Sequence, residues 1–121
     1  MQIWKKLIYR GVDYSDRFEI SNEGQLRNIN NQHVYKTSKR NGYEAVCVSY
    51  GSRSKKLLIK IHKAVAEMFV QNINNKSIVN HIDGNKLNNS FKNLEWCTNQ
   101  ENTTHAFKMR INHSFKRRKT L

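Results

Sequence analysis

The chain has 121 residues, no proline and a formal net charge of +13, from 22 Lys and Arg against nine Asp and Glu. This length suits one domain, or two very small modules that share a core. Two cysteines, Cys47 and Cys97, cannot make a disulfide framework, and the absence of a Cys-x-x-Cys motif argues against a structural zinc site. Such cysteine usage is typical of a reducing cytoplasm, where we expect the protein to act.

The excess of positive charge favours a polyanionic partner, with nucleic acid first and an anionic membrane surface second. No apolar run approaches the ~18 residues of a membrane span. The amino end carries Trp4, Lys5 and Lys6 and lacks the apolar segment of a secretory signal. We therefore expect nucleic acid and no membrane.

Residues 1–60 are predicted to form short strands, because apolar and polar residues alternate between turn signals. Lysines and arginines are interspersed along these strands, which predicts an antiparallel sheet with one apolar and one basic face. Trp4 and Phe18 are core candidates. The expected strands cover residues 4–9, 18–20, 26–29, 43–50 and 54–61.

The period then changes, and Ala64, Val65, Met68 and Phe69 predict a helix over residues 62–70 with His62 as a candidate cap. Two short strands are expected at residues 78–79 and 94–97. The Asp83-Gly84 pair predicts a tight reversal between them.

Thr98 and Glu101 have the spacing of a capping box, which predicts a helix from there to about Lys108. The composition shift near residue 60 is the best candidate for a boundary. We therefore expect an α+β fold with a β-rich module at 1–60, a strand-loop-strand-helix unit within 61–108 and a basic tail at 109–121.

His81, Asn93 and Asn102 stand out in this unit, at separations of twelve and nine residues. The stretch VNHIDGNKLNNSFKNLEWCTNQENTTHA, with IHKAVAEMF before it, resembles the HNH (His-Asn-His, ββα-metal) homing endonucleases of phage and introns. The stretch IWKKLIYRGVDYSDRFEISNEGQLRN is similar to the small β-rich module that often precedes this nuclease domain. The resemblance implies a metal-dependent endonuclease that acts on double-stranded DNA.

The resemblance also implies roles for single residues. His81 matches the general base, Asn93 the central asparagine, which we expect to hold the loop, and Asn80 and Asn102 the metal ligands. Asp83 and His105 are further candidate ligands, although Asp-Gly alone favours a turn role for Asp83. The family often has Asp where this chain has Asn80, so we expect weak binding of Mg²⁺ or Mn²⁺.

The chemistry agrees with these roles. Cleaving a phosphodiester requires an activated water and relief of charge on the phosphate. A histidine can take the proton because its pKa lies near the working pH, and one hard divalent cation can supply the rest with few protein ligands. Adjacent strand residues point to opposite faces, so the turn must bend the chain if Asn80 and His81 are to face the helix together.

The resemblance further implies a 5′-phosphate and a 3′-hydroxyl product, with a nick from a monomer and a double-strand break only from two sites, as in a homodimer. A protein partner is an alternative source of specificity. Two rivals stay open: a catalytically inactive DNA-binding protein that keeps the fold, and an RNA-binding protein that uses Tyr43 and Tyr50. The candidates for phosphate contacts are Lys39, Arg40, Arg53, Lys55, Lys56, Lys108, Arg110, Lys116, Arg117, Arg118 and Lys119.

Overall fold

The computed structural model describes residues 2–50, 55–105 and 107. They form the mixed α+β fold expected from the sequence, with antiparallel strands throughout. The elements are β1 (Trp4–Lys6), β2 (Ile8–Tyr9), β3 (Val12–Asp13), β4 (Phe18–Ser21), β5 (Leu26–Asn28), β6 (Ser38–Arg40), β7 (Tyr43–Tyr50), β8 (Lys55–Lys60), α1 (Ile61–Phe69), β9 (Ile78–His81), the 3-10 turn η1 (Phe91–Asn93) and β10 (Leu94–Cys97).

The strands before α1 form a sheet in the order β1-β4-β5, a second sheet in the order β6-β7-β8, and the hairpin β2-β3. The single strand expected at residues 4–9 is wrong, because the chain is divided at Leu7. This fully buried residue donates its N–H to the carbonyl of Phe18 and accepts from Tyr14, each at 2.9 Å. Strands β1 and β2 can therefore pair with different partners, β4 and β3.

Helix α1 lies at the centre of the molecule and contacts β2, β4, β7, β8, β9 and β10. Its buried face carries Ile61, Ala64 and Val65, which repeat at helical spacing. The expected cap at His62 is wrong: Lys60 occupies the N-cap position without a side-chain bond, and the ring of His62 turns inward instead.

One hydrophobic core joins both ends of the chain. Phe18 and Ile59 from the strands before α1 belong to the same cluster as Val65 of α1, Val79 of β9 and Leu94 of β10. Each such side chain stabilises the fold by about 1.5–3 kcal/mol. The composition shift near residue 60 is therefore a change of secondary structure within one continuous core.

Trp4 lies outside this core, contrary to expectation. Its ring is half-buried and lies 4.0 Å from the guanidinium of Arg27. That guanidinium also bonds Glu19 at 2.9 Å, so the indole covers a cross-strand ion pair on the surface of the β1-β4-β5 sheet.

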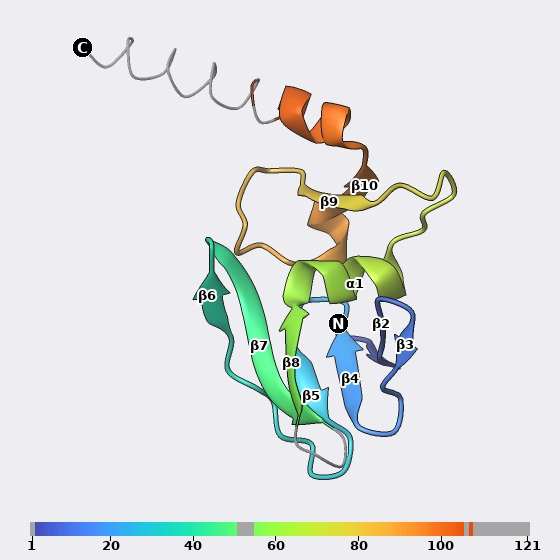
Figure 1. Cartoon of the computed structure of the whole chain (residues 1–121), viewed down its shortest axis with the longest axis vertical. Helices are drawn as coiled ribbons and strands as arrows, with labels where there is room; N and C mark the ends of the chain where they lie inside the picture. The colour runs from blue at the N-terminus through green and yellow to red at the C-terminus, as the bar shows by residue number, and fades with distance from the viewer. Residues whose placement is uncertain (1, 51–54, 106, 108–121) are drawn as a thin grey trace, which may run out of the picture.

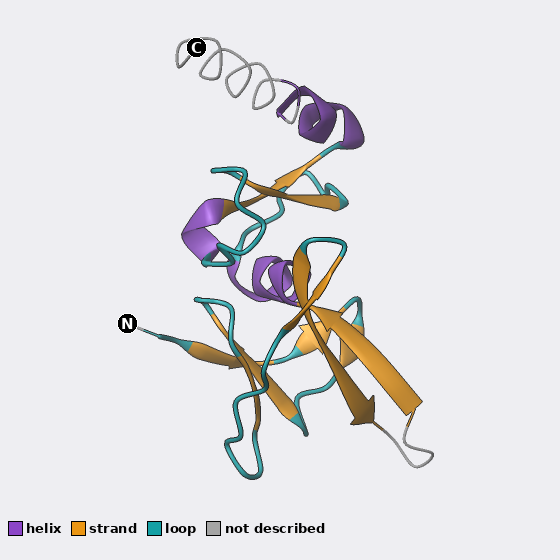
Figure 2. Ribbon diagram, turned by 90° about the vertical axis from the view of Figure 1, so that its left-hand side faces the viewer, coloured by secondary structure: helices purple, strands orange, loops and turns teal. Residues whose placement is uncertain are grey.

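The molecule is layered along its long axis (Figure 1). The first eight strands lie at one end, then α1, then the two-stranded sheet β9-β10, and finally a helix at residues 99–105. The view from the side keeps α1 and this last helix on opposite sides of β9-β10 (Figure 2). Over the described ranges, no helix has both the length and the apolar character that a membrane crossing demands.

The capping box is confirmed. The N–H of Thr98 donates to Glu101 Oε1 at 3.0 Å, and the N–H of Glu101 donates to Thr98 Oγ1 at 3.2 Å. The helix at residues 99–105 therefore begins directly after β10, as the sequence predicted.

Candidate active site

Adjacent residues at the end of β9 point to opposite faces of the β9-β10 sheet. Asn80 pairs with Glu95 and His81 pairs with Leu94 in a regular antiparallel ladder. The side chain of His81 faces α1, where its ring centroid lies 5.3 Å from that of His62. The Asp83-Gly84 turn comes after the ladder and does not bend it, so Asn80 and His81 do not share the face of the last helix.

His81 is buried, with 5% of its surface exposed, and its ring is held on several sides. Its Nε2 lies 2.7 Å from Oδ1 of Asn89, and its ring centroid lies 5.9 Å from that of Tyr43. Its Nδ1 makes no hydrogen bond to the described residues. It is not fully buried, unlike the unpaired ring nitrogens of His62 and His105. Nδ1 is therefore the ring atom that water can reach.

The ring of His62 forms a neutral wall beside His81. It stacks on Tyr43 at 4.7 Å, and the ammonium of Lys86 covers the same tyrosine at 4.6 Å. Burial, followed by the charges of His81, Lys60 and Lys63, lowers the pKa of His62 to about 4. His62 therefore stays neutral near neutral pH and places no positive charge beside His81.

Asn93 braces the loop between the two strands through three hydrogen bonds. Its Oδ1 accepts from the N–H of Asp83 at 3.0 Å, and its Nδ2 donates to Asp83 Oδ1 and to the carbonyl of Asn88, each at 2.9 Å. Asp83 also accepts from Asn85 and Asn88. These hydrogen bonds, with that from Asn88 first, lower the pKa of Asp83, and both of its carboxylate oxygens are used within the loop.

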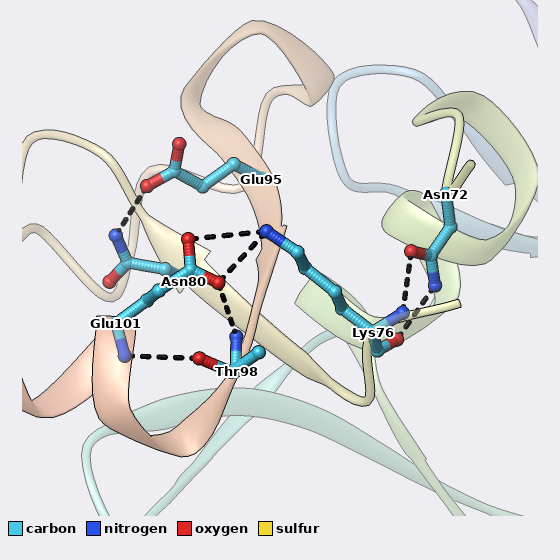
Figure 3. A network of polar contacts seen from close by, with 6 residues as sticks. All are labelled: Asn72, Lys76, Asn80, Glu95, Thr98 and Glu101. Carbon is cyan, nitrogen blue, oxygen red and sulfur yellow. Dashed lines mark hydrogen bonds and ion pairs between the residues drawn. The ribbon is translucent and has the colours of Figure 1, made fainter. Parts of the chain in front are cut away.

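The opposite face of the sheet carries a polar network (Figure 3). Asn80 donates from Nδ2 to Glu95 Oε1 at 2.8 Å, while Lys76 forms an ion pair with Glu101 at 2.8 Å. Because a carboxylate only accepts, this bond fixes the amide of Asn80 with Oδ1 turned away from Glu95. An amide oxygen is thus left available beside a negative charge.

The last helix lies on this side of the sheet and carries Asn102 and His105 in its sequence. The amide of Asn102 makes no side-chain hydrogen bond to the described part of the chain. Nε2 of His105 is buried without a partner, and this residue lines a cavity of about 390 Å³ with Glu95 and Glu101. Residues 2–50, 55–105 and 107 contain no cluster of three His, Cys, Asp or Glu that could hold a metal ion.

The predicted phosphate contacts fall on several surfaces. Lys56 pairs with Ser49 on one face of the β6-β7-β8 sheet, and the buried Val46 and Val48 lie on the other face. The exposed residues of the Lys56 face are called the open strip and are Cys47, Ser49, Lys56 and Leu58. Lys39 lies opposite Glu44, Arg40 opposite Tyr43, and Lys55 opposite Tyr50, all exposed at the ends of the sheet. The other candidates, Arg53, Lys108, Arg110, Lys116, Arg117, Arg118 and Lys119, lie outside the described residues.

Three residues near the site carried no sequence signal. Asn89 was one of many asparagines, Glu44 lies in β7, and Glu95 looked like an ordinary exposed strand residue. Asn89 contacts His81 across eight positions and Glu44 across 45, separations that no helical or strand period encodes. The one clue was the direct pairing of Glu95 with Asn80, which the strand register predicts once both strands are placed.

The order of two strands, bracing loop and helix is the architecture of a nuclease of the HNH type. The fold is similar to a solved structure of the HNH homing endonuclease I-HmuI, which is described as showing how that enzyme binds and cleaves DNA. The TM-score is 0.73 and the identity 26%, over 88% of this chain and 59% of that one. The profile of the HNH endonuclease family matches residues 60–104. Residues 60–104 therefore belong to the HNH endonuclease family.

Two curated relatives agree. The chain is 40% identical over 103 residues to the Acanthamoeba polyphaga mimivirus protein named Uncharacterized HNH endonuclease L245, covering 85% of this chain and 29% of the relative. It is 30% identical over 90 residues to the DNA endonuclease I-HmuI of Bacillus phage SP01, covering 74% of this chain and 51% of that enzyme. The chain thus spans less than a third of the first relative and about half of the second.

Proposed function

We propose that the protein is a metal-dependent DNA endonuclease of the HNH homing type that hydrolyses a phosphodiester to a 5′-phosphate and a 3′-hydroxyl, and that a monomer makes a nick. The observation that carries the proposal is His81 at the end of β9, with one ring nitrogen bonded to Asn89 and the other open to water. In this role Nδ1 of His81 takes the proton from the attacking water.

The donor set on the Asn80 face fits Mg²⁺ or Mn²⁺. Oδ1 of Asn80 is turned away from Glu95, and the amide of Asn102 makes no side-chain bond to the described part of the chain. Hard oxygen ligands in small number suit an ion that keeps several waters. Asn80 and Asn102 would hold the ion, with His105 nearby and Glu95 contributing charge. The bound ion would stabilise the charge that develops on the phosphate and on the leaving oxygen. Because His81 and this donor set face opposite sides of the sheet, the phosphate would have to lie across the end of β9 to meet both.

Asp83 has a different role in this proposal. Its two carboxylate oxygens accept from Asn85, Asn88 and Asn93, so binding a cation would break the bonds that hold the loop. Asn93 acts through the same loop and is a positioning residue.

Double-stranded DNA is the proposed substrate. Tyr43 begins β7 beside His81, and β7 leads outward from there to the open strip with Lys56. Exposed Lys39, Arg40 and Lys55 lie at the ends of the same sheet and add to its positive charge. This sheet would position the duplex through phosphate contacts, which carry no sequence information directly.

The alternative of a catalytically inactive DNA-binding protein was favoured by the neutral Asn80. Glu95, which accepts directly from Asn80, weakens that argument because it supplies a carboxylate to the same face. RNA binding would need exposed aromatic rings, but Tyr43 is stacked on His62, and Tyr50 packs edge-on against Tyr14 at 4.8 Å. The endonuclease is therefore the better supported function.

Substitution of the proposed base tests this function. His81→Ala should lower the rate of plasmid nicking in Mg²⁺ or Mn²⁺ by ~10²–10⁴, while DNA affinity measured with EDTA stays close to wild type, since the imidazole acts on water. His33→Ala, at an exposed position, is the matched control. Undiminished nicking by the His81 variant would overturn the assignment, and absence of nicking by the wild-type protein would favour the inactive alternative.

A further inference from the structure

A line of hydrogen bonds connects the β6-β7 strands to the proposed base. The hydroxyl of Thr37 donates to Glu44 Oε2 at 2.6 Å, and Nδ2 of Asn89 lies 3.3 Å from Glu44 Oε1. Oδ1 of Asn89 then lies 2.7 Å from Nε2 of His81. The acid at one end of this line lies in β7 and the histidine at the other end lies in β9.

The chemistry of Glu44 decides how the amide of Asn89 is turned. A carboxylate has no proton to donate, so the amide must present its NH₂ group to Glu44 and its oxygen to His81. The reverse orientation would place an amide oxygen against a carboxylate and an NH₂ group against Nε2. Glu44 therefore fixes an orientation that the positions of the heavy atoms alone leave open.

The amide of Asn89 in turn decides where the neutral imidazole carries its proton. Since Oδ1 can only accept, Nε2 of His81 must be the protonated nitrogen, and the lone pair must lie on Nδ1. Nδ1 is also the nitrogen that water reaches. When Nδ1 takes a proton, the bond from Nε2–H to Asn89 remains, so the ring needs no reorientation during the step.

We propose that Glu44 and Asn89 are positioning residues of the active site: Glu44 orients the amide of Asn89, and Asn89 holds His81 as the Nε2–H tautomer with Nδ1 directed at the attacking water. The inference rests on the proposed function for the role of His81 as a base. The tautomer itself is a property of the free protein.

The surroundings of Asn89 are built to hold it. Only 4% of its surface is exposed, and Gly24 lies directly against it. A Cβ at Gly24 would lie 3.0 Å from Cβ of Asn89 and 3.3 Å from its carbonyl oxygen. Gly24 also has φ of +91°, a conformation that favours glycine. The β4-β5 turn thus leaves room for Asn89 while β7 supplies its acceptor.

The first experiment measures the tautomer by ¹⁵N NMR of the whole protein at about pH 8.5, where an ordinary imidazole is neutral. We expect a protonated Nε2 on His81, with an Hε2 proton that exchanges slowly with water. Asn89→Leu should remove the slow exchange. A proton on Nδ1 in the wild-type protein would overturn the proposal, whatever the cleavage assays give.

The second experiment separates positioning from binding. Glu44→Ala and Asn89→Leu should each lower the single-turnover rate at saturating DNA by about 10- to 100-fold without changing the dissociation constant measured with EDTA. Glu23→Ala, which removes an exposed acid from the β4-β5 turn, should change neither quantity. Wild-type rates in both positioning variants would overturn the proposal.

An exchange of the two groups keeps the test clear of folding defects. Asn89→Asp alone would set two carboxylates about 3.3 Å apart and should lose rate and stability. Adding Glu44→Gln restores a donor opposite Asp at position 89, so the double variant should recover the slow Hε2 exchange and most of the rate. A double variant that melts like wild type but shows neither recovery would overturn the proposal.

Discussion

Asn80 places an amide beside the carboxylate of Glu95, on the side of the β9-β10 sheet that faces the last helix. Residues paired across two strands interact directly, and like charges at such positions are destabilising. An asparagine therefore keeps the strand pair stable without a cation, at the cost of weaker cation binding. In the proposed cation site, the identity of this one residue would set metal affinity against the stability of the metal-free fold.

Asn80→Asp should reverse that trade. Without a divalent ion the variant should melt at a lower temperature than wild type, because two carboxylates then face each other. The Mn²⁺ concentration that gives half-maximal nicking should fall, because a carboxylate binds a hard cation better than an amide. Thermal melting with EDTA or Mn²⁺ and a nicking titration measure both effects, with Asn30→Asp as a control that adds the same charge at an exposed position. An unchanged metal requirement would remove Asn80 from the ligand set.

His62 makes stability depend on pH. Its pKa is about 4 in the folded protein, whereas an unperturbed histidine has a pKa of 6.5. The unfolded chain therefore binds more protons at His62 between pH 4 and pH 6.5. The part of the free energy of unfolding that depends on neutral His62 is fully present above pH 6.5. It is lost as the pH falls toward 4, to a maximum of about 3 kcal/mol.

Urea unfolding at several pH values measures this contribution. The wild-type free energy of unfolding should fall more steeply between pH 6.5 and 4 than that of His62→Phe, and His33→Gln should follow the wild type. Parallel curves for wild type and His62→Phe would show that His62 does not titrate differently on folding.

At the scale of elements, the loop of residues 82–93 depends on Asn93. Asn93→Ala removes the three hydrogen bonds that this buried side chain makes to Asp83 and Asn88, so the free energy of unfolding should fall by about 3 kcal/mol. Asn88→Ala removes only the side-chain bond to Asp83 and should cost less. Urea denaturation of both variants is the measurement, and an equal loss in the two would contradict a special role for Asn93.

The elements that the sequence predicted best are those with a clear period. The bounds of β7 and β10 agree with the alternation of their residues, and α1 with its apolar spacing. Strand β6 was missed because Ser38, Lys39 and Arg40 are all exposed and give no alternation. The division of the first predicted strand at Leu7 follows from tertiary packing, which overrides local preference.

The site shows the same limit. His81, Asn93 and Asn102 were found because their spacing resembles a known motif, and their roles remain predictions. Glu44 and Asn89 could not be found in this way, because a carboxylate that turns an amide acts through geometry between distant elements. Only the packing of β7 against the loop before β10 brings these two side chains together.

At the scale of the whole molecule, α1 joins the strand-rich end to the β9-β10 unit through one core. The proposed base lies where the two meet, near Tyr43 of β7 and His62 of α1. A duplex bound along the β6-β7-β8 sheet would therefore reach His81 without any rearrangement between separate domains. Such a duplex needs positive charge along its path, and we expect two parts of the chain to supply it.

The open strip is one of these parts, and the basic tail is the other. Residues 108–121 carry six Lys and Arg and no acid. Each phosphate that a cation neutralises steepens the slope of log K against log salt by about 0.9. Deleting residues 114–121 removes four of these charges, so the slope should flatten by up to about 3.6 if all four contact phosphates.

Lys56→Ala should flatten the salt slope by about 0.9, whereas Lys6→Ala, on a different sheet, should leave it unchanged. Base preference should be the same in every variant, because phosphate contacts do not read sequence. A truncated protein with the wild-type slope would show that the tail does not touch DNA, and the β6-β7-β8 sheet would then have to carry the electrostatic affinity.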